Sequence, residues 1–600
     1  MSFVMKVSRG LTFSLALLLL AACDNAPPPE RAEAPDRHAN PEIATTQISK
    51  GEVHARRFMI SAANPLATQA GYDILKAGGS AVDAAIAAQL VLNLVEPQSS
   101  GIGGGAFLVY YDAGTQKVTT FDGRETAPAA ATPALFLTAD GKFMGWPAAL
   151  SSGRATGVPG VLKMLELAHQ RYGTLPWAQL FEPAIRIAEE GFMVSPRLAT
   201  MLARGKKRLA IYPDTNAFFY HGDGTPLVVG EILKNPAFAA VLHNLAENGV
   251  AAFYDGPLAA AITRRIGQAV HASAMPEYPG MNAQDLADYR AIEREPVCGA
   301  YRGYRICGMA PPSSGGITLA QIFGMLDHFD LAALEPGAAP AAHLIAEAER
   351  RAFADRNFYL GDTDQVLVPV AGLIDPVYLA SRAATIDPKR VTLFKALPGE
   401  VTLPALPARA PGDGHEGPST THLSVVDSKG NGLGLTSSIE TAFGSRLMVD
   451  GFLLNNQLTD FSFYPTENGR TVANAPGPRK RPLSSMSPTL VFAPNGSLHM
   501  IIGSPGGTRI IGFVAKTIIA HIDWEMGIQD AIAAPHIVNL NGPTYIEKNA
   551  SHPTLAQDLE AMGHKVKVMP MASGLHGIII TKEGLTGGAD PRREGVAMGD

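Results

Sequence analysis

The sequence has 600 residues, 46% of them hydrophobic and only 17% charged, which predicts a well-packed globular protein with a sizeable core. This length exceeds what one hydrophobic core usually organises, so either two domains or one large layered domain is expected. The 49 Lys and Arg against 55 Asp and Glu give a net charge of -6, which excludes the basic surface of a nucleic-acid-binding protein. Small molecules or peptides are the expected substrates.

The N-terminus has the layout of a signal peptide. A short basic stretch precedes an apolar run over residues 11–22 that is too short to span a bilayer comfortably. The run ends in Leu-Ala-Ala-Cys23, which resembles a bacterial lipoprotein signal; residues 1–22 would then be removed and Cys23 lipidated, whereas the alternative is an ordinary buried cysteine. Residues 23–50 read as a flexible tether. We therefore expect an exported protein, periplasmic or anchored to a membrane through lipid.

Two helices are predicted next, at residues 66–76 and 81–95, with Ser80 and Asp83 spaced as a capping box for the second. The glycine-rich stretch that follows superficially matches a dinucleotide-binding fingerprint. It leads into the apolar run 107–111, which reads as a strand rather than a helix, so the context for phosphate binding is wrong. A glycine turn between closely packed strands is the better interpretation.

Residues 158–295 read mostly as helices with breaks, and a hairpin follows them. Arg302 and Gly303 have the signature of its two-residue turn, flanked by β-branched and aromatic residues. In that register Cys298 and Cys307 face each other in a non-hydrogen-bonded pair, where Cβ atoms are closest. We predict a cross-strand disulfide in an oxidising compartment; the alternative is two free buried thiols.

An amphipathic helix is predicted over residues 338–361, and a mobile Pro/Gly/Ala-rich linker over residues 395–419. The helix carries His343 and Glu347 with i,i+4 spacing, which could in principle bind a metal. Because no third ligand suggests itself, we expect no metal site, and a helix-surface or ion-pair role is adequate for both side chains.

After the linker, alternating apolar residues indicate antiparallel hairpins, and two helices come later in the chain. This segregation predicts an α+β fold of sheets flanked by helices. The expected strands are residues 421–427, 432–439, 489–492 and 498–503, and the expected helices are residues 509–522 and 528–533.

Thr420 begins this second part of the chain. A threonine at a chain terminus can use its own α-amine, with a pKa of roughly 8, as the base that activates its hydroxyl. Thr420 could become such a terminus only through cleavage after Ser419, by attack of its hydroxyl on the preceding carbonyl. Local sequence alone makes this conceivable and no more.

Several ordered motifs resemble those of the γ-glutamyltranspeptidase family, and the resemblance runs from about residue 60 to residue 597. They are Asp73-Ile-Leu-Lys-Ala-Gly-Gly79, Gly103-Gly-Gly105, Arg124-Glu-Thr-Ala-Pro128, Pro312-Ser-Ser-Gly-Gly316, Ala354-Asp-Arg356, Thr420-Thr-His-Leu-Ser-Val-Val-Asp427, Gly451-Phe-Leu-Leu-Asn-Asn-Gln457, Arg481-Pro-Leu-Ser-Ser-Met-Ser-Pro488, Gly503-Ser-Pro-Gly-Gly507 and Gly588-Ala-Asp-Pro591. The resemblance implies a four-layer αββα N-terminal-nucleophile hydrolase sandwich. It also implies one precursor split into a large subunit, residues 51–419, and a small catalytic subunit, residues 420–600, which stay together as a heterodimer.

The resemblance also assigns roles to residues. Thr420 matches the family nucleophile and Ser438 a supporting hydroxyl, with a plain strand serine as the alternative. Gly506 and Gly507 match glycines whose N–H groups form an oxyanion hole, although a tight turn before the next helix would explain them too.

For the substrate, Arg124 matches the family arginine that makes a bidentate contact with a carboxylate. Ser484 and Ser485 match the hydroxyl groups that bind the same carboxylate. Asp460 and Gln457 match groups near the substrate ammonium. Taken singly, Arg124 or Asp460 would more often be a surface ion pair; as members of one pocket they favour substrate binding.

Two departures from the family pattern bear on specificity. Glu440 replaces an asparagine common in the family, and Thr459 replaces the first of two adjacent aspartates. Glu440 could hold the substrate ammonium or repel an α-carboxylate and favour another acyl group. The stretch 463–478, where family members carry a lid, looks short and leaves acceptor preference open.

The leading hypothesis is a self-cleaving γ-glutamyl hydrolase or transferase that acts on glutathione and related amides and passes the acyl group to water, an amino acid or a peptide. No metal or cofactor is expected. One rival is an acylase for glutaryl or cephalosporin-type amides. The other, from a different class, is a lipid-anchored binding protein that has lost catalysis.

Overall fold

The computed structural model describes residues 1–2, 44, 48–271, 278–401, 407–412, 416–548, 550 and 552–600. Contacts divide the chain into Met1–Asn40, of which only the first two residues are described, and Pro41–Asp600. The predicted signal peptide, Cys23 and most of the predicted tether therefore lie outside the described residues. Among the described helices, none is both long enough and apolar enough to cross a membrane.

Two seven-stranded sheets organise the unit Pro41–Asp600. The first has the order β24-β2-β11-β12-β3-β4-β7 and the second the order β1-β23-β22-β18-β17-β9-β8, and every pairing within them is antiparallel. The strands of the first sheet are β2 (Met59–Ala62), β3 (Gly105–Asp112), β4 (Lys117–Gly123), β7 (Ile292–Arg294), β11 (Ser419–Val426), β12 (Gly432–Glu440) and β24 (Val596–Gly599). Those of the second are β1 (Val53–Ala55), β8 (Val297–Tyr301), β9 (Tyr304–Gly308), β17 (Thr489–Phe492), β18 (Leu498–Gly503), β22 (His576–Thr581) and β23 (Gly584–Ala589).

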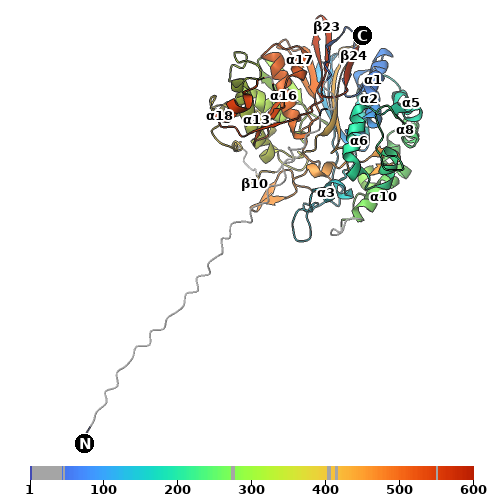
Figure 1. Cartoon of the computed structure of the whole chain (residues 1–600), viewed down its shortest axis with the longest axis horizontal. Coiled ribbons are helices and arrows are strands. Elements are labelled where there is room, and N and C mark those ends of the chain that lie inside the picture. Colours follow the sequence, from blue (N-terminus) through green and yellow to red (C-terminus); the bar gives the residue numbers. More distant parts are fainter. Residues whose placement is uncertain are drawn as a thin grey trace. The chain divides into compact units, whose positions relative to one another are not determined.

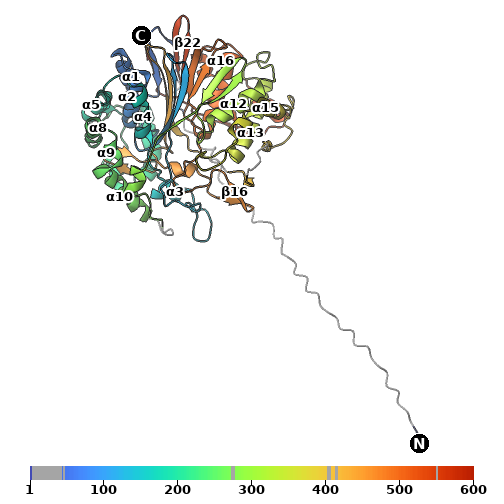
Figure 2. The same cartoon turned by 180° about the vertical axis from the view of Figure 1, so that it is seen from behind.

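The sheets pack face to face over an apolar layer, and helices cover both outer faces. Val109, Val426, Ile501 and Ile578 of that layer come from both sheets and are buried. On one side lie α1 (Pro65–Lys76), α2 (Ala81–Val95) and α4 (Val161–Tyr172), and on the other α12 (Gly315–Leu326), α13 (Ala339–Tyr359), α16 (Ile510–Ile522) and α17 (Ile528–Ala533), as Figures 1 and 2 show from opposite directions. This is the αββα layering that the resemblance to the γ-glutamyltranspeptidase family implied, and it agrees with the α+β fold predicted from the sequence pattern.

Local signals placed most of these elements correctly. α2 begins at Ser80, whose hydroxyl accepts from the Asp83 nitrogen while the Asp83 carboxylate accepts from the Ser80 nitrogen, so the predicted capping box is confirmed. The glycine-rich stretch leads into β3, and the hairpins around residues 428–431 and 493–497 form as expected.

The hairpin β8–β9 has the predicted register. Arg302 and Gly303 take φ angles of +49° and +81°, as a tight two-residue turn requires. Cys298 lies opposite Cys307 with 4.1 Å between Cα atoms, and the two sulfurs are bonded.

Three expectations need correction. Helix α13 is not a surface helix, because His343, Glu347 and most of its other side chains are buried. The predicted linker is not mobile throughout: Ser419 belongs to β11, and the preceding residues from Glu416 are partly buried. The mostly helical stretch 158–295 also contains β7, which completes the first sheet because its residues pair with β4.

Candidate active site

Thr420 lies near the start of β11, where the register to β12 shifts between Ser419 and Thr420. Such bulges often re-aim the chain beside functional sites. The hydroxyl of Ser438, which is opposite Thr420, donates to the carbonyl oxygen of Ser419 at 2.9 Å. Both Thr420 and Ser438 are buried, with 2% of each exposed. The carbonyl that precedes Thr420 is therefore polarised by a hydroxyl held within a strand.

Gly506 and Gly507 form the turn between β18 and α16. Their φ angles of +140° and +58° favour glycine. A Cβ atom on Gly507 would come within 2.6 Å of the Gly417 carbonyl oxygen and 2.8 Å of the Glu416 carbonyl oxygen. The turn thus lies directly against the segment that ends at Thr420, and no larger residue fits there.

Arg124, just after β4, is fully buried and bonded to the loops around it. Its Nη2 donates to Asp460 Oδ2 at 2.6 Å and to the Leu483 carbonyl at 2.9 Å, and its Nε donates to the Pro482 carbonyl at 3.1 Å. Gln457 Nε2 donates to the same Asp460 oxygen at 2.7 Å. The structure therefore brings together three of the predicted substrate-binding residues.

The two predicted serines differ in their surroundings. Ser484 accepts a hydrogen bond from the Met486 nitrogen at 3.2 Å, within its own loop. Ser485 instead faces the segment before the cleavage site: its hydroxyl donates to Glu416 Oε1 at 2.8 Å and accepts from Arg356 Nη2 at 2.9 Å. Ser485 is thus part of a carboxylate-binding arrangement that is occupied in this uncut chain.

Glu440, at the end of β12, has a φ of +83°, an unusual conformation for a glutamate. Its nitrogen donates to Ser438 Oγ at 2.8 Å, and its Oε1 accepts from the Gly417 nitrogen at 2.5 Å. The other departure from the family pattern, Thr459, donates to the Asn456 carbonyl at 2.8 Å and so closes its own turn. Glu440, but not Thr459, contacts the segment before Thr420.

Burial dominates the electrostatics of these carboxyl groups. Desolvation raises the pKa of Asp460 well above its usual range, and the nearby Glu440 charge raises it further, while Arg124 opposes both effects. Burial also raises the pKa of Glu125 to about 7, with Arg124 again opposing. Several carboxyl groups with raised pKa values thus lie close to Arg124. Such groups are common where charged ligands bind.

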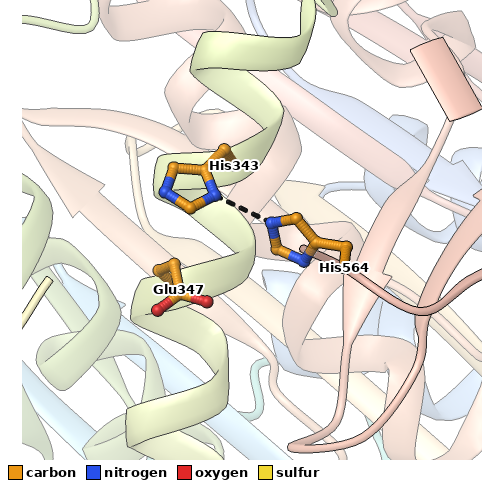
Figure 3. Close-up of side chains that lie close together, drawn as sticks. All are labelled: His343, Glu347 and His564. Atoms are coloured by element: carbon orange, nitrogen blue, oxygen red, sulfur yellow. Dashed lines mark hydrogen bonds between the residues drawn. The ribbon is translucent and has the colours of Figure 1, made fainter. Parts of the chain in front are cut away.

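A third potential metal ligand, His564, lies beside His343 and Glu347, and sequence reasoning missed it. Figure 3 shows His564 pointing at His343, with Glu347 one turn along α13. The Nδ1 of His343 and the Nε2 of His564 are 2.8 Å apart. However, Glu347 Oε2 accepts from Arg351 at 2.7 Å, its Oε1 accepts from Arg350, and these two guanidinium groups oppose a cation. The geometry fits a hydrogen-bonded histidine pair beside an ion-paired glutamate.

Sequence reasoning also missed Arg356, Glu416 and Arg593. Arg593 Nη1 donates to the Thr420 carbonyl at 3.1 Å, and Arg356 holds Glu416. Arg356 did have a sequence signal, because it stands in the motif Ala354-Asp-Arg356. In the structure it is buried on α13. Glu416 had no such signal, because it stands in a Gly/Pro-rich stretch that is typical of linkers.

The predicted lid stretch, residues 463–478, contains a small hairpin of β15 (Thr466–Glu467) and β16 (Arg470–Val472). β16 also pairs with β10 (Arg409–Ala410). A short hairpin, rather than a long loop, therefore follows the Asp460 region.

Two facing antiparallel sheets between helical layers, with a buried threonine at the start of a central strand, define the class of N-terminal-nucleophile hydrolases. Comparison with known proteins narrows the class. A family profile described as Gamma-glutamyltranspeptidase matches residues 67–600. The chain belongs to the γ-glutamyltranspeptidase family.

Relatives support this assignment over nearly the whole chain. It is 39% identical over 552 residues to the glutathione hydrolase proenzyme of Escherichia coli (strain K12), covering 90% of this chain and 91% of that one. It is 37% identical over 554 residues to the glutathione hydrolase proenzyme of Bacillus subtilis (strain 168), with the same coverage. The crystal structure of cephalosporin acylase from Bacillus halodurans superposes with a TM-score of 0.80 at 28% identity, covering 94% of this chain and 99% of that one.

Proposed function

We propose that the chain cleaves itself between Ser419 and Thr420 and then hydrolyses or transfers the γ-glutamyl group of glutathione and related amides. The observation that carries this proposal is the 2.9 Å hydrogen bond from Ser438 Oγ to the Ser419 carbonyl, next to the Thr420 side chain. Attack of the Thr420 hydroxyl on that carbonyl transfers the acyl group from nitrogen to oxygen. Water then hydrolyses the ester and leaves a Ser419 carboxylate and a free Thr420 amine.

In the cleaved enzyme the Thr420 amine takes the proton of its own hydroxyl as the oxygen attacks the γ-amide carbon. The N–H groups of Gly506 and Gly507 stabilise the oxyanion, and the departing amine takes up the proton. Water or an amino acid then accepts the acyl group from Thr420. No cofactor takes part in these steps.

Substrate recognition follows from the charged groups around Arg124. Arg124, with Ser484 and Ser485, binds the α-carboxylate, while Asp460, Gln457 and Glu440 receive the α-ammonium. This excess of carboxylate groups favours a substrate end that carries an ammonium.

An acylase for glutaryl or cephalosporin-type amides is the second candidate. A solved structure of similar fold, a cephalosporin acylase, supports it. Glu440 counts against it, because a glutaryl group keeps the carboxylate but lacks the ammonium that Glu440 would attract. γ-Glutamyl and glutaryl 4-nitroanilides differ only in the α-amino group. We expect faster turnover of the γ-glutamyl compound; faster turnover of the glutaryl compound would favour the acylase, and no turnover of either would favour a binding protein.

We further propose that residues 1–22 direct export and that Cys23 carries the lipid anchor, which leaves the enzyme periplasmic or membrane-attached. Residues 51–419 and 420–600 then form the two subunits of one heterodimer. Export to an oxidising compartment suits the Cys298–Cys307 bond. Metabolic labelling with a palmitate analogue tests the anchor: a Cys23→Ser variant should lose the label.

A further inference from the structure

Arg356 is a second buried guanidinium beside the cleavage site. It projects from α13, and only 1% of it is exposed. Its Nε donates to Ser314 Oγ at 2.9 Å and its Nη1 to Asn357 Oδ1 at 3.0 Å, so its position is fixed from two sides. Its Nη2 reaches Ser485 Oγ at 2.9 Å.

The carboxylate of Glu416 fills the space between these groups. Its Oε1 accepts from Arg356 Nη2 and from Ser485 Oγ, and its Oε2 accepts from the Ser485 nitrogen. Only 6% of this side chain is exposed. A guanidinium, a hydroxyl and a backbone N–H that converge on one carboxylate form a built anion site.

Glu416 stands three residues before the peptide bond to be cleaved, and its segment is held along its length. The Glu416 nitrogen donates to Thr508 Oγ1 at 3.3 Å, and the Gly417 nitrogen donates to Glu440 Oε1 at 2.5 Å. The Ser419 carbonyl accepts from Ser438. The Glu416 carboxylate is therefore the anchor at one end of a short clamped segment whose other end is the reacting carbonyl.

We propose that Arg356 and Ser485 form a carboxylate site that serves twice: first for Glu416, which positions the Ser419–Thr420 bond for cleavage, and later for the same α-carboxylate of the substrate that Arg124 binds. The second use rests on the proposed function. The first use concerns only the uncut chain.

Cleavage allows the carboxylate of the substrate to replace that of Glu416. Before it, Glu416 is tethered at both ends, so its effective concentration at the site is high and a free carboxylate cannot compete. Afterwards Glu416 belongs to a free chain end and can leave. Arg356 stays buried, and the carboxylate of the substrate can take the place of the Glu416 carboxylate.

The first experiment follows self-cleavage of purified precursor on denaturing gels. Because bond positioning by intramolecular anchoring is worth orders of magnitude in rate, Glu416→Gln should cleave at least about tenfold more slowly, and Glu416→Asp should recover part of the rate. Glu400→Gln, an exposed glutamate of the same connecting region, is the matched control and should cleave normally. Normal cleavage of Glu416→Gln would overturn the proposal.

Loss of folding is separated from loss of anchoring by a second measurement. In a Thr420→Ala background, which blocks cleavage, calorimetric titration compares Glu416 intact with Glu416→Ala, using L-glutamate and glutarate as probes. We expect binding only when Glu416 is removed. Equal binding to both proteins, or none to the double variant, would overturn the shared site.

The two probes also separate this inference from the proposed function. Binding of glutarate without L-glutamate to the double variant would support the shared carboxylate site and contradict the γ-glutamyl preference. Binding of L-glutamate supports both.

Discussion

Two buried charge clusters, both built partly on α13, differ in the sign of their excess charge. The cleavage cluster sets three carboxylates against two guanidinium groups and consists of Arg124, Arg356, Glu416, Glu440 and Asp460. The helix cluster sets one carboxylate against two guanidinium groups and consists of His343, Glu347, Arg350, Arg351 and His564.

The carboxylates of the two clusters also differ in hydrogen bonding. Among the described residues, Asp460 Oδ1 and Arg124 Nη1 have no hydrogen-bond partner. In the helix cluster, both oxygens of Glu347 accept from arginines, and each histidine ring donates or accepts at both nitrogens. Arg350 Nε has no hydrogen-bond partner among the described residues. Unused hydrogen-bonding capacity on a buried carboxylate points to ligand binding, whereas a carboxylate that is bonded at both oxygens stabilises the fold.

The largest expected effect belongs to the cleavage site. Thr420→Ala removes the attacking hydroxyl, so the precursor should stay uncut and catalysis should fall by at least about a thousandfold. Thr421→Ala is the matched control, because its neighbouring hydroxyl has no hydrogen-bond partner within the described part of the chain. Gels and nitroanilide turnover measure both; cleavage of the Thr420 variant at the normal rate would place the nucleophile elsewhere.

Removal of the Ser438 hydroxyl should slow cleavage by about a hundredfold, the usual effect of deleting one donor to a developing oxyanion. Ser437→Ala provides the comparison: its hydroxyl donates to the Gly105 carbonyl at 3.3 Å, away from Ser419. If the two variants cleaved at the same rate, the hydrogen bond to Ser419 would have no catalytic part.

The helix cluster should respond in stability rather than in chemistry. Glu347→Gln leaves two buried guanidinium groups without their carboxylate and should lower the free energy of unfolding by about 3–5 kcal/mol. Denaturant unfolding measures this loss. Turnover per folded molecule should stay within about twofold of normal, and a large fall there would mean that the helix cluster takes part in catalysis.

Acid should weaken the helix cluster through His564, whose pKa burial lowers to about 4. The unfolded chain, with a histidine pKa near 6.5, binds protons that the folded state rejects. Stability is therefore retained above about pH 6.5 and falls toward pH 4, by at most about 1.4 kcal/mol per pH unit from this group. Unfolding curves at several pH values should show a shallower slope in His564→Asn; an unchanged slope would contradict the assignment.

The smallest expected effect is that of removing or adding a metal ion on the Tm. Because Arg350 and Arg351 oppose a cation, neither EDTA nor added Zn²⁺ should shift the Tm. A zinc-dependent rise in Tm that disappears in His564→Asn would show that the helix cluster binds metal.

Much of the fold could be predicted from local patterns. The capping box at Ser80, the turn at Arg302 and Gly303 and the strands on either side of Lys429 each depend on neighbours in sequence. Alternating apolar residues predicted the adjacent strands 421–427 and 432–439, and the structure pairs Thr420 with Ser438 on them.

The missed features depend on contacts between distant segments. His564 reaches His343 across 221 residues, and no periodicity encodes such a contact. Glu416 looked like part of a flexible linker because glycine and proline dominate its surroundings. Its order comes from Arg356 and Ser485, which belong to other elements and supply the bonds that offset its loss of conformational freedom.

The central claim is that Thr420 becomes a chain terminus. Intact-mass and N-terminal analysis of the smaller fragment of the purified protein tests it most directly. The expected fragment comprises residues 420–600 and has a free threonine amine. A single uncut chain after prolonged incubation, or a small fragment that begins at any other residue, would contradict it.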